Sequence, residues 1–306
     1  MSTQIIYNGV DITPDITLTK CILTDSNGGK QDYCRLSFAN GGKVWNEWEA
    51  QLNDTVQIKH GHSDGGVMFV NGIESNSNVF SLVLLSTPTS TKTKKSRIWR
   101  KVKLSEIISD VAKNIGFKTQ FYGFKDYTYE SLSQINQTDL SFMNDVCMRE
   151  GYNVKIFNRT IIIFNEKTLY SAEASGVIYP DDCNSYGFYS KNLPLSAVTV
   201  KYYDTAKRRF INYTAKENGI IGGSENFIYK VDNQAQAQRY ATNILNRNNN
   251  FIDCGIISLK NADGFSSGSV INLSGFKGYG GKWYIHESTF DTLKNECTFS
   301  INRIRG

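Results

Sequence analysis

The sequence predicts an α+β protein, mainly β, in which two similar small antiparallel β-barrels flank a helix–helix–hairpin α/β module. Three observations support this fold class. One strand pattern occurs near both ends of the chain, helical spacing of apolar residues is confined to the region between the copies, and aromatic residues, which favour β structure, make up 12% of the chain. We expect the first barrel at residues 1–88, the α/β module at 89–180 and the second barrel at 181–306, with an inserted helix at about 232–248.

The repeated strand pattern covers residues 52–85 and 265–304. Each copy has an alternating strand, a Gly-rich turn, an apolar triplet and, after a loop, a last strand. The matching landmarks are Gly65-Gly66 with Gly280-Gly281, Met68-Phe69-Val70 with Trp283-Tyr284-Ile285, and Phe80 with Phe299. Short strands separated by glycine turns are typical of small barrels. Because duplication within one chain is a way of building symmetry, the pattern favours a part of an assembly over an enzyme.

The remainder of the first domain also has the period of β strands. Alternating residues between Ile16 and Phe38, together with the first repeat copy, predict five or six strands. Asn27-Gly28-Gly29 and Asn40-Gly41-Gly42 have the composition of turns between strands.

A basic segment, TPTSTKTKKSRIWRKVK, follows at residues 87–103 and contains no acidic residue. Its seven basic residues are Lys92, Lys94, Lys95, Arg97, Arg100, Lys101 and Lys103. Clustered positive charge binds nucleic acid or an acidic partner surface, so this segment is a candidate surface for a partner or for the lumen of an assembly. The alternative is a solvated linker at the exit of the first barrel. The single aromatic residue Trp99 gives no basis for base stacking.

Two helices are predicted in the middle of the chain. Apolar residues at helical spacing predict the first at residues 104–115, and Gly116 suits the position just after its end. The second is predicted at about residues 139–150, with Thr138 as N-cap and Gly151 ending it.

Strands follow each helical region. The segments YNVKIF and TIIIFN predict a short hairpin around Asn158-Arg159. Farther along, LSAVTVKYYD alternates cleanly, and RRFINYTA is its expected hairpin partner. The helix at about 232–248 has an apolar stripe, and we expect Asp232 to be its N-cap.

Composition and charge exclude several classes of protein. The net charge of +5 is a mild surplus that does not by itself indicate a polyanion partner. The N-terminal residues do not resemble a signal peptide, and no apolar run is long enough to span a membrane. The six cysteines have no CxxC or zinc spacing, which favours buried free thiols in a protein made in the cytosol.

The sequence indicates no catalytic, cofactor or metal site. It contains no GxSxG, P-loop, HExxH or GxGxxG motif. His60 and His62 form an HxH pair, but we interpret them as solvated loop residues, and His286 has no evident partner for catalysis. The pair Asp181-Asp182 follows a proline and is explained by a turn rather than by acid–base chemistry. We therefore expect no catalytic residue, no cofactor and no metal.

Residues 134–164 read QINQTDLSFMNDVCMREGYNVKIFNRTIIIF. At Asp139, Phe142, Glu150, Gly151 and Tyr152 this run resembles the late control gene D family of phage tail proteins. The preceding KLSEIISDVAKNIGF is similar to the first helix of the same family module. Near the C-terminus, an Ala-rich helix ending at Arg247 is followed by GFSSGSVINLSGF and GGKWYI, which resemble the family's ending. The resemblance covers most of residues 100–306.

This resemblance implies a structural baseplate hub protein of a contractile phage tail or a phage-tail-like bacteriocin, related to type VI secretion spike proteins. Such proteins form trimers with two similar barrels per subunit. The implied role is a pseudo-six-fold adaptor between the hexameric tail tube and the trimeric central spike. The expected partners are a homotrimer, the tube protein, the spike protein, other baseplate proteins and the tape measure protein. The implied location is the baseplate of a particle assembled in the bacterial cytoplasm.

Two alternatives belong to other functional classes. One is a tail-associated cell-wall hydrolase, which requires two carboxylates with tuned pKa values, and the sequence singles out no such pair. The other is a receptor- or carbohydrate-binding module at the tail tip that uses the many Tyr and Trp residues. Because the chain ends at Gly306, soon after the second barrel, we expect any spike to be a separate polypeptide. The sequence leaves open whether the particle is a phage or a headless device.

Overall fold

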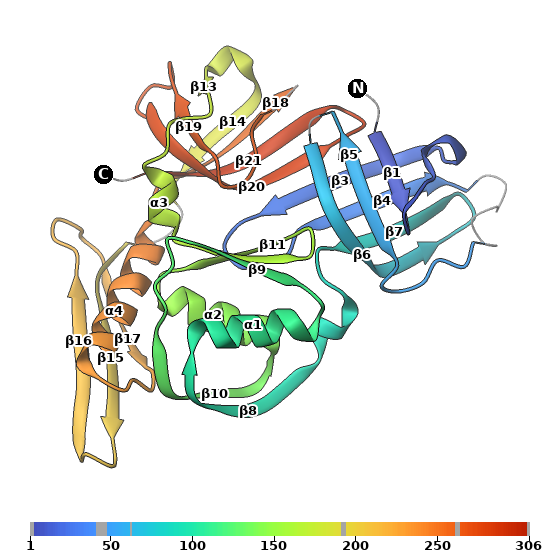
Figure 1. Ribbon diagram of the computed structural model, residues 1–306. Helices are drawn as coiled ribbons and strands as arrows, with labels where there is room; N and C mark the ends of the chain where they lie inside the picture. The colour runs from blue at the N-terminus through green and yellow to red at the C-terminus, as the bar shows by residue number, and fades with distance from the viewer. Residues whose placement is uncertain (1–2, 41–47, 62, 191–193, 261–263, 305–306) are drawn as a thin grey trace.

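The structure is a computed structural model that describes residues 3–40, 48–61, 63–190, 194–260 and 264–304 (Figure 1). Most of its strands form one 13-stranded sheet. In Figure 1 this sheet occupies the upper part of the molecule, and the middle module and a smaller α/β layer lie below it. The prediction of a mainly-β α+β protein is confirmed.

The N-terminal half of the large sheet is a unit built from residues 3–85, and it has a core of its own. Its strands are β1 (Thr3–Tyr7), β2 (Val10–Asp11), β3 (Leu18–Ser26), β4 (Tyr33–Ala39), β5 (Thr55–His60), β6 (Ser63–Ser75) and β7 (Val79–Leu85). They lie in the order β3-β4-β7-β6-β5-β1-β2. Alternate residues such as Leu36, Ile58 and Leu82 point inward and are fully or almost fully buried. The predicted Asn27-Gly28-Gly29 turn joins β3 to β4, whereas residues 41–42 of the second predicted turn lie outside the described residues.

The C-terminal half of the sheet is a second unit with a separate core around Trp283 and Phe299. Its strands are β13 (Val177–Ile178), β14 (Cys183–Tyr189), β18 (Cys254–Lys260), β19 (Val270–Leu273), β20 (Gly281–Asp291) and β21 (Glu296–Arg303). They lie in the order β14-β18-β21-β20-β19-β13. A 3₁₀ turn at Pro180–Asp182 precedes β14, which agrees with the turn predicted for the Asp181-Asp182 pair.

The two units share their strand order and their irregularities. β3, β4, β7, β6 and β5 of the first unit correspond to β14, β18, β21, β20 and β19 of the second. The ladder between β6 and β7 is interrupted at Asn71, and the ladder between β20 and β21 at His286. The β3–β4 ladder is interrupted at Thr19 and the β14–β18 ladder at Asn184. Because β-bulges mark particular positions in a fold, these shared positions indicate one architecture used twice.

The ladder registers refine the repeat predicted from the sequence. The glycine pairs and the apolar triplets occupy equivalent positions, since Met68 lies opposite Val56 and Trp283 lies opposite Ile271. The last strand is offset from the expected alignment: in the ladders, Phe299 is equivalent to Leu82 rather than to Phe80.

The two units are fused through β3 and β20, and the described strands do not close either unit into a barrel. β3 pairs antiparallel with β20 from Ser26 opposite Glu287 to Ile22 opposite Asp291. The edge of β3 opposite β4 is therefore paired with the other unit, and β3 does not pair with β1 to close the first unit. In the second unit the closing strand β13 has only two residues and pairs only with β19 among the described strands. The expected barrels are thus two open units within one sheet.

The middle module encloses two helices between two sheets. The ribbon of β8 (Lys94–Lys103) and β10 (Thr128–Thr138) lies on one side of α1 (Leu104–Asn114) and α2 (Asp139–Arg149) in Figure 1. On the other side lie β9 (Lys118–Tyr122), β11 (Asn153–Phe157) and β12 (Thr160–Phe164), in the order β11-β12-β9. Ile107, Phe142 and Ile161 are among the buried residues of this core. The short helix α3 (Glu166–Tyr170) leads from β12 to the second unit.

The predicted boundaries of the two middle helices are confirmed. The hydroxyl of Thr138 accepts a hydrogen bond from the Ser141 N–H at 3.1 Å and caps α2. Gly116 and Gly151 follow the helices with φ of 71° and 85°, which favours glycine. The hairpin turn at Asn158-Arg159 has φ of 46° and 56°, as a two-residue type I′ turn requires.

A smaller α/β layer consists of a three-stranded sheet and one helix. Its strands are β15 (Leu195–Asp204), β16 (Arg209–Lys216) and β17 (Gly223–Ile228), in the order β16-β15-β17, and α4 (Gln234–Asn249) covers one face. The β15–β16 hairpin predicted from the sequence is confirmed. The N-cap of α4 is Asn233 and not Asp232, because Asn233 accepts from the Gln236 N–H at 3.0 Å. Asp232 instead accepts from the Glu130 N–H of β10 at 3.0 Å.

Candidate functional site

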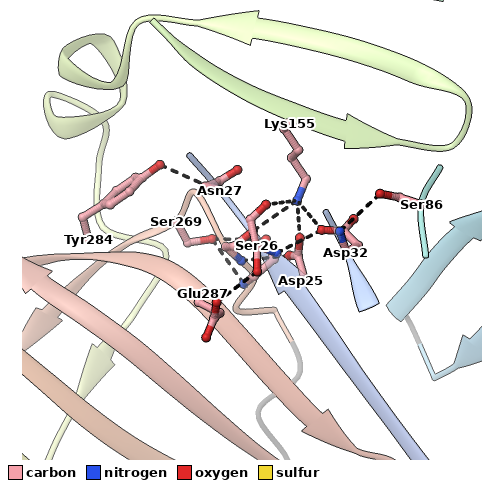
Figure 2. Close-up of polar contacts among 11 residues, drawn as sticks. Asp25, Ser26, Asn27, Asp32, Ser86, Lys155, Ser269, Tyr284 and Glu287 are labelled. Carbon is pink, nitrogen blue, oxygen red and sulfur yellow. Dashed lines mark hydrogen bonds and ion pairs between the residues drawn. The ribbon is translucent and has the colours of Figure 1, made fainter. Parts of the chain in front are cut away.

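The two β units and the middle module meet around the side chain of Lys155 on β11 (Figure 2). Its ammonium group forms an ion pair with Asp25 at the end of β3 and lies 3.8 Å from Oδ1 of Asp32. It also donates to the Ser26 carbonyl at 3.4 Å and to Ser267 Oγ of the second unit at 3.2 Å. One charged group of the middle module therefore contacts both the first and the second unit. We call Asp25, Asp32, Lys155 and Ser267 the junction cluster.

The carboxylates of the junction cluster also hold the backbone. Asp32 Oδ1 accepts from the Ser26 N–H at 3.0 Å, and Asp25 Oδ2 accepts from the Ser267 N–H at 3.1 Å. The tight turn between Ser26 and Asp32 makes the first contact possible, because Gly28 and Gly29 both have positive φ. A Cβ at Gly29 would lie 2.1 Å from Oδ1 of Asn144 on α2, so this turn is pressed closely against the middle module.

Charge in the junction cluster is unbalanced, since two carboxylates share one ammonium. Burial raises the pKa of Asp32 to about 7; Lys155 opposes this rise and the charge of Asp25 adds to it. The side chain of Asp32 is 5% exposed and that of Lys155 is 17% exposed, so water screens these charges only weakly.

A cavity of about 430 Å³ lies beside the junction cluster. Polar and apolar residues line it, including Asp25, Asp64, Lys155, Phe157 and Phe265. Within the part of the chain that the structure describes, no three His, Cys, Asp or Glu side chains are arranged to hold a metal ion. The carboxylates of Asp25 and Asp32 are engaged by backbone N–H groups and by Lys155.

A second contact between modules explains part of the Glu-Gly-Tyr motif. The carboxylate of Glu150 is fully buried and accepts from Arg239 of α4, at 2.7 Å from Nε and 3.2 Å from Nη2. Gly151 lies against the same helix, where a Cβ would be 2.8 Å from Oδ1 of Asn243. The Tyr152 hydroxyl accepts from the Lys125 N–H at 2.8 Å and donates to the Lys125 carbonyl at 3.1 Å. The motif therefore connects the middle module to α4.

The basic segment forms a strand and not a linker. Lys92 lies in the 3₁₀ turn Thr89–Lys92, and the other six residues lie on β8, which pairs with β10 along one edge. Two of them are engaged within the middle module: Lys95 lies 2.6 Å from Asp139, and Arg97 contacts Asp139 at 3.0 Å and Asp110 at 3.1 Å. The Arg97 guanidinium also stacks 3.8 Å from the centre of the Trp99 ring.

The remaining basic residues are exposed. No ion pair with the described residues involves Lys92, Lys94, Arg100, Lys101 or Lys103. The basic segment is therefore divided into two residues that stabilise the module and five that leave positive charge on the surface. That this surface faces a partner or a lumen stays a prediction.

The sequence predicted the burial of the cysteines better than that of the histidines. His60 is 3% exposed on β5, where its ring contacts Phe290 at 5.1 Å between centres, so its interpretation as a solvated loop residue is wrong. His62 lies outside the described residues. All six cysteines are free thiols, and five of them are buried, as predicted; Cys183 is partly exposed.

Comparison with solved structures places this architecture among tail proteins. A tail protein from Neisseria meningitidis superposes with a TM-score of 0.78 at 9% identity, covering 99% of this chain and 96% of that one. The 43 kDa tail protein of prophage MuSo2 from Shewanella oneidensis gives a TM-score of 0.72 at 12% identity, covering 98% and 97%. This chain has the fold of phage tail proteins.

A component of the E. coli type VI secretion system, itself similar in structure to the bacteriophage T4 tail proteins gp27 and gp5, gives a TM-score of 0.61 at 12% identity. That comparison covers 95% of this chain and 74% of the other. No family model and no curated protein sequence matches the chain. The expected likeness to tail proteins is confirmed at the level of the fold, whereas the two expected barrels are open units of one sheet. No helix of the described residues has the length and apolar character needed to cross a membrane.

Proposed function

We propose that this chain is a structural baseplate hub subunit of a contractile phage tail or a phage-tail-like particle. Three copies would form a ring with pseudo-six-fold symmetry that joins a hexameric tail tube to a trimeric central spike. The observation that carries this proposal is the duplication of one strand architecture, with bulges at Asn71 and His286 and at Thr19 and Asn184. The fold shared with tail proteins of phage and type VI origin supports it.

Duplication has a mechanical use at a symmetry mismatch. A six-fold tube needs six similar docking surfaces, whereas a three-fold spike needs three identical ones. Three chains with two equivalent units each supply both sets, because every unit repeats the same strand order. The proposed domains are the first unit at residues 1–88, the α/β module at 89–180 and the second unit at 181–306. In the structure β13 of the second unit precedes residue 181, and the insertion comprises β15–β17 together with α4.

A structural role also fits the side chains at the junction cluster. Lys155, Asp25 and Asp32 connect the two units and the middle module, so their chemistry is used to hold the subunit rigid. We propose that the chain is not an enzyme and binds no cofactor. Its partners would be two further copies, the tube, spike and other baseplate proteins and the tape measure protein, within a particle assembled in the bacterial cytoplasm. The exposed residues of the basic segment would face an acidic partner or the lumen.

The position of the chain in an imaged particle tests this proposal. We expect density for three copies between the last ring of the tube and the base of the spike. Particles in which the chain is absent from that position, or decorates the periphery of the baseplate, would contradict the hub assignment. Lysis of peptidoglycan by the purified chain, abolished by one carboxylate substitution, would instead favour a hydrolase.

A further inference from the structure

Among the described residues the two units pair with each other once, through β20 and β3, whereas each unit has a strand equivalent to β20 and a strand equivalent to β3. Beyond its bulge at His286, β20 leaves β19 and pairs along that edge with β3. Residues 72–74 of β6 occupy the equivalent position beyond the bulge at Asn71. Among the described residues, their edge opposite β7 has no ladder partner, because β5 pairs only with residues 63–69.

The strand equivalent to β3 is also open. In the ladders with β4 and β18, Leu23 of β3 is equivalent to Phe188 of β14, and Thr24 is therefore equivalent to Tyr189. β14 pairs with β18 on one side and, within the described part of the chain, has no ladder on the other. In the first unit, β6 therefore has an unpaired edge equivalent to the edge of β20 that pairs with β3. In the second unit, β14 has an unpaired edge equivalent to the edge of β3 that pairs with β20.

We propose that β6 of one copy of the chain pairs antiparallel with β14 of a second copy, in the register of the internal β20–β3 contact. Within the chain, Asp25 lies opposite Ser288 and Thr24 lies opposite Thr289. The equivalent pairs between copies are Ile73 with Ser190 and Glu74 with Tyr189. This inference deepens the proposed hub function, from which it takes the number of copies, and names the surface and the register by which they join.

The exposed side chains at the two edges fit such a contact. Ile73 is 38% exposed on β6, and Tyr189 and Tyr186 of β14 are 39% and 53% exposed. Two counterparts in the other unit are more buried: Ser288, equivalent to Ile73, is 7% exposed, and Cys21, equivalent to Tyr186, is 0% exposed. An exposed strand edge with apolar side chains is a template for pairing with another chain. Pairing would satisfy its backbone groups and cover this apolar surface.

The contact is directional, which determines the kind of assembly. Each contact joins β6 of one copy to β14 of the next. The first copy therefore keeps a free β14 edge, and the second keeps a free β6 edge. Such heterologous contacts continue until the chain of copies closes into a ring. Since the internal and the intermolecular contacts have the same geometry in this proposal, a ring of three copies contains six equivalent units joined by six equivalent contacts.

Engineered disulfides test the register. The hydroxyls of Thr24 and Thr289 lie 3.2 Å apart, so cysteines at these two positions are within disulfide reach. Thr24→Cys/Thr289→Cys is therefore the positive control and should form an intramolecular bond. Glu74→Cys/Tyr189→Cys places cysteines at the equivalent intermolecular positions. On mild oxidation of the assembled protein, we expect covalent trimers on a non-reducing gel and at least a tenfold lower yield from either single variant.

A second pair of cysteines tests whether cross-linking depends on the register or only on the proximity of the two strands. Glu74→Cys/Gly187→Cys displaces one cysteine by two residues along β14, and we expect it to cross-link at least fivefold less than Glu74→Cys/Tyr189→Cys. Light scattering on the same samples before oxidation reports the mass. A trimeric mass without preferential cross-linking of Glu74→Cys/Tyr189→Cys would overturn the β6–β14 pairing and leave the hub proposal standing. A chain that stays monomeric throughout would contradict both.

Discussion

Lys155 connects parts of the chain that are far apart in sequence. It contacts Asp25 and Asp32 of the first unit and Ser267 of the second, and it belongs to the middle module. No local pattern in the sequence could have indicated this cluster, because its members are separated by as many as 242 residues. By contrast, Glu150 was found through the family resemblance, and the structure gives it a physical role as the buried partner of Arg239.

Removing the ammonium group of the junction cluster should destabilise the subunit. In Lys155→Met, Asp25 and Asp32 would share a partly buried site with no counter-charge. We expect the free energy of unfolding at pH 8 to fall by about 2–3 kcal/mol, and by less at pH 5, where protonation relieves the repulsion. Urea denaturation at both pH values measures this. Lys118→Met removes an exposed lysine and should be nearly neutral; equal effects of the two substitutions would contradict the role of Lys155.

The titration of Asp32 should be visible in the pH dependence of stability. Its pKa is about 7 in the folded protein and near 3.8 in the unfolded chain, so folding favours the protonated carboxyl. The resulting stabilisation is complete below about pH 4 and is lost as the pH rises towards 7. Asp32→Asn should therefore lose less stability than the parent between pH 5 and 8. Thermal denaturation across this range provides the measurement, with exposed Asp181→Asn as control; parallel curves for parent and Asp32→Asn would refute the assignment.

The pair Glu150–Arg239 should behave as one unit. Arg239→Met leaves a fully buried carboxylate without its cation and should cost about 3 kcal/mol of unfolding free energy. Adding Glu150→Gln removes the stranded charge, so the double variant should be more stable than Arg239→Met alone. A double-mutant cycle by chemical denaturation measures the coupling. Additive effects would show that the two residues act independently.

At the scale of elements, the sequence predicted best where the signal is local. α1 and α2 have apolar stripes, an N-cap at Thr138 and glycines at their ends, and all of these were found in the structure. β8 was missed as a strand because KKSRIWRKVK exposes mostly charged residues and Val102 is its only buried residue. Asp232 was mistaken for the cap of α4, because sequence alone cannot show that its carboxylate is used by the Glu130 N–H.

The structure divides the basic segment into two groups that charge reversal should separate. Lys94→Glu/Arg100→Glu/Lys103→Glu changes only exposed residues without ion pairs to the described chain, so the melting temperature should stay within about 2 °C of the parent. If this surface meets an acidic partner, assembly into particles should fall and should become less sensitive to salt. Particle yield at two salt concentrations measures this.

The matched variant Lys95→Glu/Arg97→Glu removes both cations that contact Asp139 and should lower the melting temperature itself. Normal particle yield from the first variant would show that its three side chains are merely solvated. An unchanged melting temperature for the second would contradict the structural role of Lys95 and Arg97.

At the scale of the whole molecule, the repeat predicted from the sequence corresponds to two units with the same strand order. How these units are joined depends on the β20–β3 contact, which could not be predicted from the sequence. The matching strands, glycine pairs and apolar triplets were visible because each lies within about 40 residues of chain. The β20–β3 contact joins residues more than 260 positions apart, and it makes the two units parts of one sheet. The same contact defines how a unit joins its neighbour.

We propose that copies of this chain close into a ring of three. The mass of the purified chain by native mass spectrometry, measured over a range of concentrations, tests it most directly. We expect a species of three times the chain mass of 34.5 kDa that persists on dilution to low micromolar concentration. A chain that remains monomeric at every concentration, or that forms only a two-copy species, would contradict it.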